Sequence, residues 1–392
     1  MKIKAKIKRK DMRKLSLYVH IPFCVQKCRY CDFLSYQASV QEKEEYVKLL
    51  MQEIVLQAPL YRQHQVISVF FGGGTPSVLD GEIIEKILCK LKEAFVFESN
   101  PEITIEVNPG TVTEEKLKIF FAAGVNRLSI GLQSANDEEL RCLGRIHDYK
   151  TFLETYEWAR KTGFQNINID LMSAIPGQSE QSYRETLMKV LALQPEHISA
   201  YSLILEEGTW FYDHQKELVF PTEDEDRAFY ELTGEMLSHK GYHRYEISNY
   251  AREGYECLHN KVYWKRGDYL GLGLGAASMV EEVRWNNKRI MEEYKKAVID
   301  NKVSQRTDLG ENVEHLTKEE QMEEFMFLGL RLTEGVRKSD FKQKFGIPME
   351  TVYGEVLEKM QQEGLLVVEE SVYLTAYGMD VSNYVMAQFL LN

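Results

Sequence analysis

The stretch His20-Ile-Pro-Phe-Cys-Val-Gln-Lys-Cys-Arg-Tyr-Cys-Asp-Phe33 begins in the last two residues of the strand-like run Leu15–Ile21 and continues into the loop after it. It places Cys24, Cys28 and Cys31 in one short loop with the spacing C-x3-C-x2-C. Three thiolates can hold three irons of a cubane cluster, whereas a complete cysteine set for a [4Fe–4S] cluster has four members. The spacing therefore predicts a [4Fe–4S] cluster in which one iron is left open.

An open iron can take a small chelating ligand. The amino and carboxylate groups of a methionine suit that place, which is how S-adenosylmethionine (SAM) is recruited for radical chemistry. The alternatives for the loop are a structural zinc site and three unrelated buried thiols. Zinc sites favour C-x2-C pairs followed by a second pair, which the sequence lacks. Chance accounts poorly for the spacing, because half of the six cysteines lie in this loop.

Strand-like runs alternate with segments of helical periodicity up to about residue 203. This alternation is typical of parallel strands joined by right-handed crossovers, and six such units predict an α/β fold with a partial (β/α)6 TIM-like barrel. Functional groups of such barrels gather at the C-terminal ends of the strands, which is where the cysteine loop lies. The predicted strands are Leu15–Ile21, Val66–Phe71, Ile103–Val107, Arg127–Gly131, Asn166–Leu171 and His197–Leu203, and the predicted helices include Glu42–Gln57 and Gly81–Ala94.

Two glycine-rich stretches stand out. Gly72-Gly73-Gly74-Thr75-Pro76 follows the second predicted strand, where missing side chains let backbone amides approach a ligand. A tight turn between strand and helix is the alternative explanation for these glycines. Gly267–Ala277 has glycine at alternate positions around Gly271 and Gly275. This pattern predicts a strand with one bare face, suited to a flat ligand or to another backbone.

Polar side chains end several of the predicted strands. Glu106 ends the third, Gln133 the fourth and Asp170 the fifth, with Arg145 shortly after Gln133. At a barrel rim such groups can bind a ribose, an amine or a sulfonium. The alternative for each is an ordinary rim residue that bonds to loop backbone.

Composition and charge limit the class of protein. The chain has 392 residues, 44% of them hydrophobic, which is enough for one large and one smaller core. No apolar run approaches the roughly 18 residues that span a bilayer, and the basic N-terminus lacks the apolar stretch of a secretory signal. Thiolate ligands fit a reducing compartment, so we expect a cytoplasmic protein. Of the remaining cysteines, we expect Cys89 and Cys142 to be buried packing residues. Cys257 is expected to be a packing residue as well, with an iron ligand as the alternative.

The charge is unevenly distributed. Residues 1–14 hold eight Lys or Arg and one Asp, although the whole chain has a net charge of −12. The acidic body argues against a nucleic-acid partner, because phosphates would be repelled. The basic arm is either a solvated tail or a peripheral contact with an anionic membrane, at about 1 kcal/mol per basic residue. We expect the arm over residues 1–14, the barrel domain over 15–307 and a separate domain over 308–392.

The C-terminal region is expected to form a winged-helix-like domain. Helical spacing covers Glu319–Leu332 and Met349–Glu363, Leu365–Leu374 has the pattern of a hairpin, and a final helix follows. The charge of this region argues against DNA binding, since residues 319–392 carry six basic and thirteen acidic side chains. The presumed recognition helix itself is acidic. We interpret the domain as a packing or partner-docking module.

The chain resembles the radical-SAM family, and within it the haem chaperones of the oxygen-independent coproporphyrinogen III oxidase-like group. The lead-in Tyr18-Val-His-Ile-Pro-Phe-Cys24 and the exit Tyr30-Cys31-Asp32-Phe33 carry the resemblance, which extends over nearly the whole chain. It implies a [4Fe–4S] cluster on the three loop cysteines, with SAM as its partner. The SAM positions implied in this way are Tyr18, Tyr30, Gly74, Thr75, Glu106, Gln133, Arg145 and Asp170.

Two features favour the chaperones within this group. The oxidases have another cysteine two positions after the third cluster ligand, where this chain has Phe33. His259-Asn260-Lys261-Val262-Tyr263-Trp264 matches the HNxxYW motif of the chaperones, in which a neutral imidazole suits haem iron. A structural histidine is the alternative for His259. The resemblance implies a chaperone that passes haem to acceptor haem proteins such as respiratory cytochromes, with an oxygen-independent coproporphyrinogen oxidase as the alternative.

Overall fold

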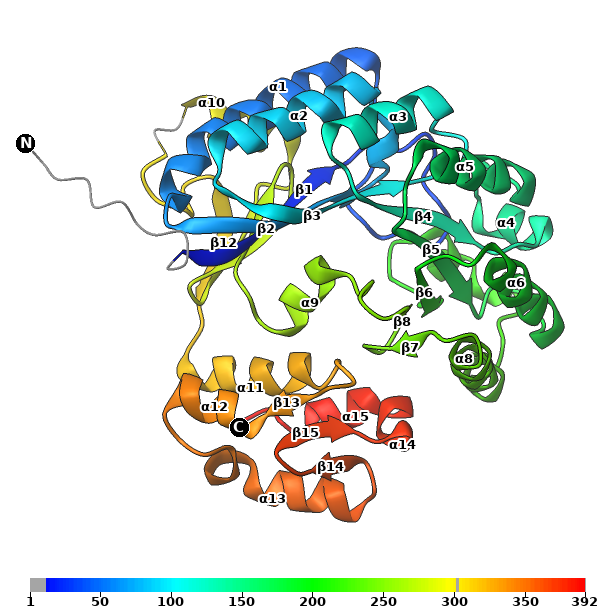
Figure 1. The fold of residues 1–392 in the computed structure, drawn as a ribbon, viewed down its shortest axis with the longest axis vertical. Coiled ribbons are helices and arrows are strands. Elements are labelled where there is room, and N and C mark those ends of the chain that lie inside the picture. Colours follow the sequence, from blue (N-terminus) through cyan, green and yellow to red (C-terminus); the bar gives the residue numbers. More distant parts are fainter. Residues whose placement is uncertain (1–11, 301–302, 392) are drawn as a thin grey trace, which may run out of the picture.

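The computed structural model of the chain describes residues 12–300 and 303–391 (Figure 1). The basic arm predicted over residues 1–14 lies mostly outside these described residues, because the description begins at Met12. Within the described ranges, no helix combines the length and apolar character needed to cross a membrane.

Six parallel strands form the centre of the molecule, and each pairs with the next along the chain. This order confirms the predicted partial (β/α)6 barrel. The strand positions agree with the predicted runs, and the ends differ by up to six residues. The strands are β1 (Arg13–Ile21), β2 (His64–Gly73), β3 (Phe97–Val107), β4 (Arg127–Gln133), β5 (Ile167–Ser173) and β6 (His197–Ser202).

Helices cover the outer, convex face of the sheet (Figure 1). Their apolar stripes pack against the strands; α2, for example, buries Ile84, Ile87, Leu88 and Leu91. Helices α3, α4 and α5 end at glycines in the left-handed region, the usual stop signal of a helix. The helices in this part of the chain are α1 (Val40–Gln57), α2 (Gly81–Ala94), α3 (Glu114–Ala123), α4 (Asp137–Leu143), α5 (Tyr149–Thr162), α6 (Glu180–Leu193), α7 (Trp210–Asp213) and α8 (Glu223–Ser238), with α10 (Met291–Asp300) further along.

The cysteines outside the loop have three different environments. Cys257 is fully buried, as expected, and Cys142 is partly buried in a small apolar cluster. Cys89 is exposed, so the prediction that it is a buried packing residue is wrong. The physical reason is its position on α2, on the side of the helix away from the buried stripe.

Short strands extend the sheet at both edges to twelve. At one edge, β9 runs parallel to β1 and is followed by three antiparallel strands; at the other, two antiparallel strands continue from β6. Apart from β9, which lies within the predicted strand Gly267–Ala277, these strands were not predicted, because several have too few residues for a visible period. They are β9 (Tyr269–Leu272), β10 (Ala277–Val280), β11 (Val283–Asn287), β12 (Gly310–His315), β7 (His243–Arg244) and β8 (Asn249–Ala251).

The prediction of one continuous strand over Gly267–Ala277 is wrong. The chain turns between β9 and β10, with Gly273 and Gly275 at φ angles of 99° and 65°, in the region that favours glycine. A Cβ atom at Gly273 would collide with the hydroxyl of Tyr46 and the carbonyl of His20. Here the glycines allow other groups of the protein to approach closely. Of the two alternatives left open by the sequence, a flat ligand and another backbone, the structure therefore favours packing against the protein itself.

Helix α9 (Leu258–Trp264) lies on the concave side of the sheet, between the sheet and the C-terminal domain (Figure 1). Its first amides donate to one carboxylate of β3: Leu258 N to Glu102 Oε2 at 2.9 Å and His259 N to Glu102 Oε1 at 3.0 Å. Buried Arg127 lies close enough to interact with that carboxylate. These contacts are in the N-terminal parts of the strands, so α9 closes the end of the barrel opposite the cysteine loop.

The C-terminal domain has a hydrophobic core of its own, running from Met322 to Phe389. Three helices precede a hairpin, the order expected of a winged-helix-like domain, and the hairpin joins a short third strand. The predicted final helix is divided into two short ones. The elements are α11 (Lys318–Gly329), β13 (Val336–Arg337), α12 (Lys338–Phe345), α13 (Met349–Gln362), β14 (Leu366–Val368), β15 (Ser371–Leu374), α14 (Ala376–Asp380) and α15 (Ser382–Ala387).

Candidate iron–sulfur and SAM site

The cysteine loop leaves the C-terminal end of β1 and packs against the glycine run that follows β2. Gly74 N donates to Ile21 O at 2.8 Å, and Thr75 N donates to Phe23 O at 2.7 Å. A Cβ atom at Gly74 would lie 2.8 Å from the carbonyl oxygen of Phe23, which is too close. Glycine is therefore needed at this position to bring the two loops together, whatever else the run binds.

The three loop cysteines are partly exposed, and each sulfur lies near a polar group. Cys24 Sγ is 3.5 Å from Thr75 Oγ1, Arg145 Nη1 donates to Cys28 Sγ at 3.5 Å, and Cys31 Sγ is 4.0 Å from Ser35 Oγ. Hydrogen bonds to cluster sulfurs are one means by which proteins tune Fe–S potentials. The loop thus combines three accessible thiols with polar support.

No three His, Cys, Asp or Glu side chains in the described part of the chain gather as the ligands of a single metal ion would. In a cubane cluster each thiolate bonds a different iron, so three sulfurs need not converge on one point. A loop of three thiols at the rim of a radical-SAM-like barrel therefore suits a [4Fe–4S] cluster in its donor set.

Arg145 and Asn108 connect the surroundings of two cysteines. Beside Cys28, Arg145 Nη1 also donates to the hydroxyl of Tyr30 at 3.4 Å, and Nη2 donates to Asn108 Oδ1 at 2.5 Å. Asn108 Nδ2 in turn donates to Thr75 Oγ1 at 2.9 Å, next to Cys24. Asn108 is absent from the predicted site, although its place two residues after Glu106, at the end of β3, is the same signal that identified the other rim residues.

Two carboxyl groups face the barrel interior below the rim. Glu106 Oε2 accepts from Gly73 N at 3.2 Å, and burial, with the charge of Asp170 in addition, raises the pKa of Glu106 to about 8. Asp170 accepts from Asn168 Nδ2 at 2.7 Å and from Ser129 Oγ at 3.1 Å, and burial raises its pKa as well. A ligand with an amine or a sulfonium would stabilise the ionised form of both carboxyl groups.

The remaining predicted SAM residues surround two further glycines. A Cβ atom at Gly72 would touch Tyr18 and Glu106, and a Cβ atom at Gly131 would touch Gln133, Arg145 and Asn108. Tyr18 bonds through its hydroxyl to His20 Nδ1 at 3.0 Å, and Gln133 is buried with a φ angle of 72°. The eight predicted SAM positions therefore lie along the rim and the upper interior of one barrel.

His259 lies on α9 inside the barrel, and its ring centroid is 6.5 Å from that of Tyr18, one of the predicted SAM residues. It is 1% exposed, and its ring packs on Phe70 with 5.1 Å between ring centroids. Nδ1 bonds to Ser68 Oγ at 2.9 Å and Nε2 to the Tyr263 hydroxyl at 3.0 Å, while Ser68 donates to Ser16. Burial lowers the pKa of His259 to about 3, so the ring is neutral, but both of its nitrogens are occupied.

Known proteins resemble the chain over nearly its full length. The family described as the Radical SAM superfamily matches residues 18–190, and the HemN C-terminal domain matches residues 316–381. The heme chaperone HemW of Bacillus subtilis is 37% identical over 96% of this chain and 99% of its own length, and that of Lactococcus lactis is 35% identical over 96% of this chain and 97% of its own.

A solved structure gives the same result for the fold. The coproporphyrinogen III oxidase HemN from Escherichia coli, described as a radical SAM enzyme, superposes with a TM-score of 0.85 at 27% identity, covering 97% of this chain and 91% of that one. The barrel and the C-terminal domain are thus both matched by a single known protein. With the extent of its likeness to HemW sequences, the chain belongs to the HemW heme chaperone family of radical-SAM proteins.

Proposed function

We propose that this protein is a haem chaperone that binds haem, holds a [4Fe–4S] cluster with SAM, and passes the haem to acceptor haem proteins. The observation that carries the proposal is the likeness to HemW chaperones over 96% of the chain, together with an intact three-cysteine loop. Because the cluster needs free thiols, a reducing cytoplasm is the compartment that suits it.

In this proposal Cys24, Cys28 and Cys31 hold the cluster, and SAM completes the coordination of its open iron. When bound, the pair supplies one-electron chemistry at the sulfonium of SAM. The protein's own side chains orient the cofactor. Arg145 and Thr75 lie beside the sulfurs of the cluster cysteines. Burial favours the protonated forms of Glu106 and Asp170, and the cationic groups of SAM would favour their ionised forms when SAM binds.

The proposal that His259 ligates haem iron needs a second conformation. In the described one, α9 is anchored to Glu102, and the imidazole has no free nitrogen. Ligation therefore requires α9 to leave the barrel, which would break these bonds and expose an apolar interior.

A haem titration followed by a transfer assay tests the function. The reconstituted protein should bind haemin with a distinct Soret band, and it should then deliver haem to an apo b-type cytochrome faster than an unrelated haem-binding protein such as albumin does. Failure to bind haem, or delivery no faster than from albumin, would contradict the chaperone function.

The alternative function is oxygen-independent coproporphyrinogen III oxidation, which the likeness to HemN favours. Phe33 stands where the oxidases have an additional cysteine, and its side chain is exposed. We therefore expect the reconstituted protein, given SAM, a reductant and coproporphyrinogen III, to form no protoporphyrinogen. Catalytic turnover to that product, followed by chromatography, would replace the chaperone function with the oxidase function.

A further inference from the structure

Helix α9, which carries His259, is short and lacks a capping side chain of its own. It has seven residues, and the side chain of its N-cap residue, Cys257, makes no capping bond. Helix N-termini are ordinarily capped by a Ser, Thr, Asp or Asn at this position. Isolated helices shorter than about 12 residues are also unstable in water. The helical form of α9 therefore depends on the surface on which it lies.

Side chains from elsewhere in the fold supply the missing cap. The amides of Leu258 and His259 both donate to the carboxylate of Glu102. The amide of Cys257 donates to the Tyr245 hydroxyl at 3.3 Å. Glu102 lies on β3, 156 positions before Leu258 in the sequence. The cap of α9 is therefore a tertiary contact, and it is lost as a whole when the N-terminal turn of the helix moves away.

Hydrogen bonds, more than apolar packing, attach α9 to the barrel. Besides His259, α9 buries one side chain, that of Val262, whereas the apolar stripe of α2 buries four aliphatic side chains. A hydrogen bond contributes less net free energy than a buried aliphatic side chain, because water bonds to both partners when they separate. Separation from the barrel therefore costs less for α9 than for α2.

The two ends of α9 are held differently. Beyond its C-terminal end, the side chain of Arg266 is 1% exposed and bonds to Glu324 of α11 at 2.9 Å and to Glu282 at 2.7 Å. Before its N-terminal end, the chain passes through an exposed turn at Gly254, which has a φ angle of 83°. The end that carries His259 is therefore the one that can move, while the other end stays attached.

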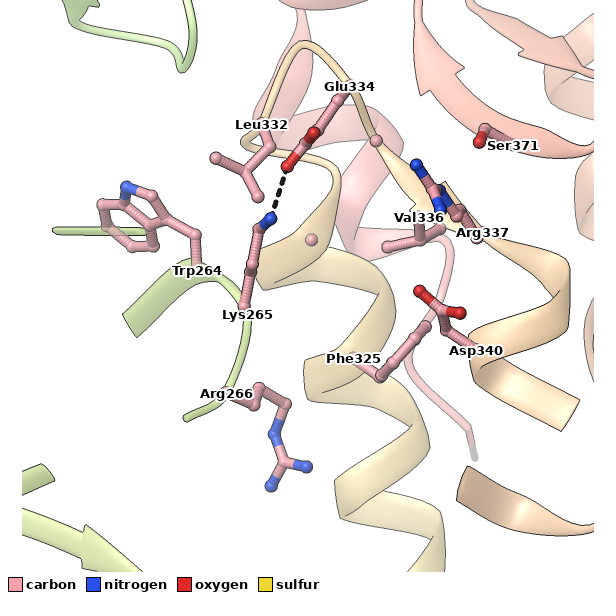
Figure 2. A pocket seen from close by; sticks show the side chains of 12 residues that line it. Trp264, Lys265, Arg266, Phe325, Leu332, Glu334, Val336, Arg337, Asp340 and Ser371 are labelled. Carbon is pink, nitrogen blue, oxygen red and sulfur yellow. Dashed lines mark ion pairs between the residues drawn. The ribbon is translucent and has the colours of Figure 1, made fainter. Parts of the chain in front are cut away.

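Unfilled space lies beside the attached end. A cavity of about 420 Å³ separates the segment Trp264–Arg266 from the C-terminal domain, and Figure 2 shows this segment on one side and Phe325 of α11 on the other. The Lys265–Glu334 pair at this cavity is about half exposed on both sides. Groups that line a void lack packing partners on that side. The C-terminal domain therefore leaves room for α9 to tilt about Arg266.

We propose that Glu102 is a positioning residue that keeps α9 in this closed conformation, and that separation of the N-terminal turn of α9 from Glu102 frees the imidazole of His259 for haem iron. The proposal rests on the haem-chaperone function proposed above. Haem then selects the open conformation, and its measured affinity falls in proportion as that conformation is rare. A change that weakens only the closed conformation should therefore tighten haem binding.

Ser68→Ala tests the proposal at a position outside the HNxxYW motif. It removes the bond to Nδ1 of His259, which belongs to the closed conformation. Haemin binding should tighten about fivefold, or about 1 kcal/mol, while the free energy of unfolding falls. The matched control is Tyr183→Phe, which removes a buried bond of similar length, 2.8 Å, to Thr233. The control should also lose stability, but its haemin affinity should stay within about twofold of the unaltered protein.

Glu102→Gln should have a larger effect, because it places an amide group where two backbone donors meet. Haemin binding should tighten at least tenfold, and the amides of Leu258 and His259 should exchange faster with deuterium. The control, Glu53→Gln, alters a buried carboxyl group that accepts from the amide of Gly273 and should change neither result. Glu102→Gln combined with His259→Ala should lose the gain in affinity.

The outcomes separate the closed conformation from the chaperone function. If the unaltered protein binds haemin and neither Ser68→Ala nor Glu102→Gln binds it more tightly, α9 does not compete with haem, and the role of Glu102 is overturned while the chaperone function stands. A gain in affinity that persists without His259 would also overturn the proposal. Absence of haemin binding to the unaltered protein and to both variants would instead overturn the proposed function itself.

Discussion

The two ends of the barrel place the same residue types in opposite situations. At the C-terminal end of the strands, Cys28 is partly exposed in a loop and receives a hydrogen bond from Arg145. At the other end, Cys257 is fully buried beside Glu102, and burial raises its pKa to about 12. The comparison teaches that access to a ligand, more than residue type, separates a binding group from a structural one.

The largest expected effect is at the cysteine loop. In the proposed cluster each of the three thiolates holds a different iron, so Cys28→Ala should lose most of the iron and sulfide after anaerobic reconstitution. The same result is expected for Cys24→Ala and Cys31→Ala. Cys89→Ala, on the exposed side of α2, is the matched control and should keep the full content. Normal iron content in Cys28→Ala would refute the cluster assignment.

In the interior of the barrel, His259→Ala should act first on stability. The change deletes a buried ring and leaves Ser68 and Tyr263 without their hydrogen-bond partner, so the free energy of unfolding should fall by about 3 kcal/mol. Tyr263→Phe removes one of these bonds and should cost about 1 kcal/mol. Urea unfolding measures both. Unchanged stability of His259→Ala with a lost Soret band would instead support His259 as an iron ligand.

The pH dependence of stability tests the buried carboxyl of Glu106, at the end of β3. Glu106 keeps its proton to about pH 8 in the folded chain, whereas its ordinary pKa is 4.5. Folding therefore takes up a proton between these values, and the stability that this group contributes falls as the pH rises toward about 8.

Glu106→Gln cannot ionise, so its stability relative to the unaltered protein, measured without SAM, should rise by about 2 kcal/mol between about pH 6 and about pH 8.5. Glu115→Gln, at an exposed position, is the control and should follow the unaltered protein at both pH values. Parallel pH curves for Glu106→Gln and the unaltered protein would show that Glu106 is ionised throughout.

The smallest expected effect is at Asn108, which positions Arg145 and Thr75 without bonding to a cysteine. Asn108→Ala should weaken SAM binding about tenfold, or about 1.4 kcal/mol, when SAM is titrated against the electron spin resonance signal of the reduced cluster. Asn108→Asp keeps the acceptor for Arg145 and should recover part of the affinity. Loss of the cluster itself would show that Asn108 holds the loop and not the cofactor.

Local patterns predicted the parallel barrel and the cysteine loop. The six strand runs and the spacing of Cys24, Cys28 and Cys31 depend on neighbours in sequence, and the observed β1 to β6 follow them. The turn at Gly273 depends on distant groups, Tyr46 and His20, which no local pattern reveals. Edge strands of two to four residues, such as β7 and β9, are formed mainly by pairing with distant strands.

The positions of the candidate site residues in the fold could be predicted to a similar extent and for the same reason. Rim residues such as Glu106 follow from their place at strand ends, whereas the link from Asn108 to Arg145 joins residues 37 apart in sequence. The sequence of the HNxxYW motif suits a ligand and a buried core equally, since His and aromatic residues serve both. Only the folded chain reveals that His259 faces Ser68 and Tyr263.

The most direct test of the account is the haemin affinity of the protein with and without its cluster. If haem is held by the part of the chain around α9 and the cluster by the loop after β1, the two sites should be nearly independent. Titration of the anaerobically reconstituted protein and of its cluster-free form should then give dissociation constants that agree within about twofold. A difference of tenfold or more, or haemin binding only when the cluster is present, would contradict the account and place the haem at the cluster end of the barrel.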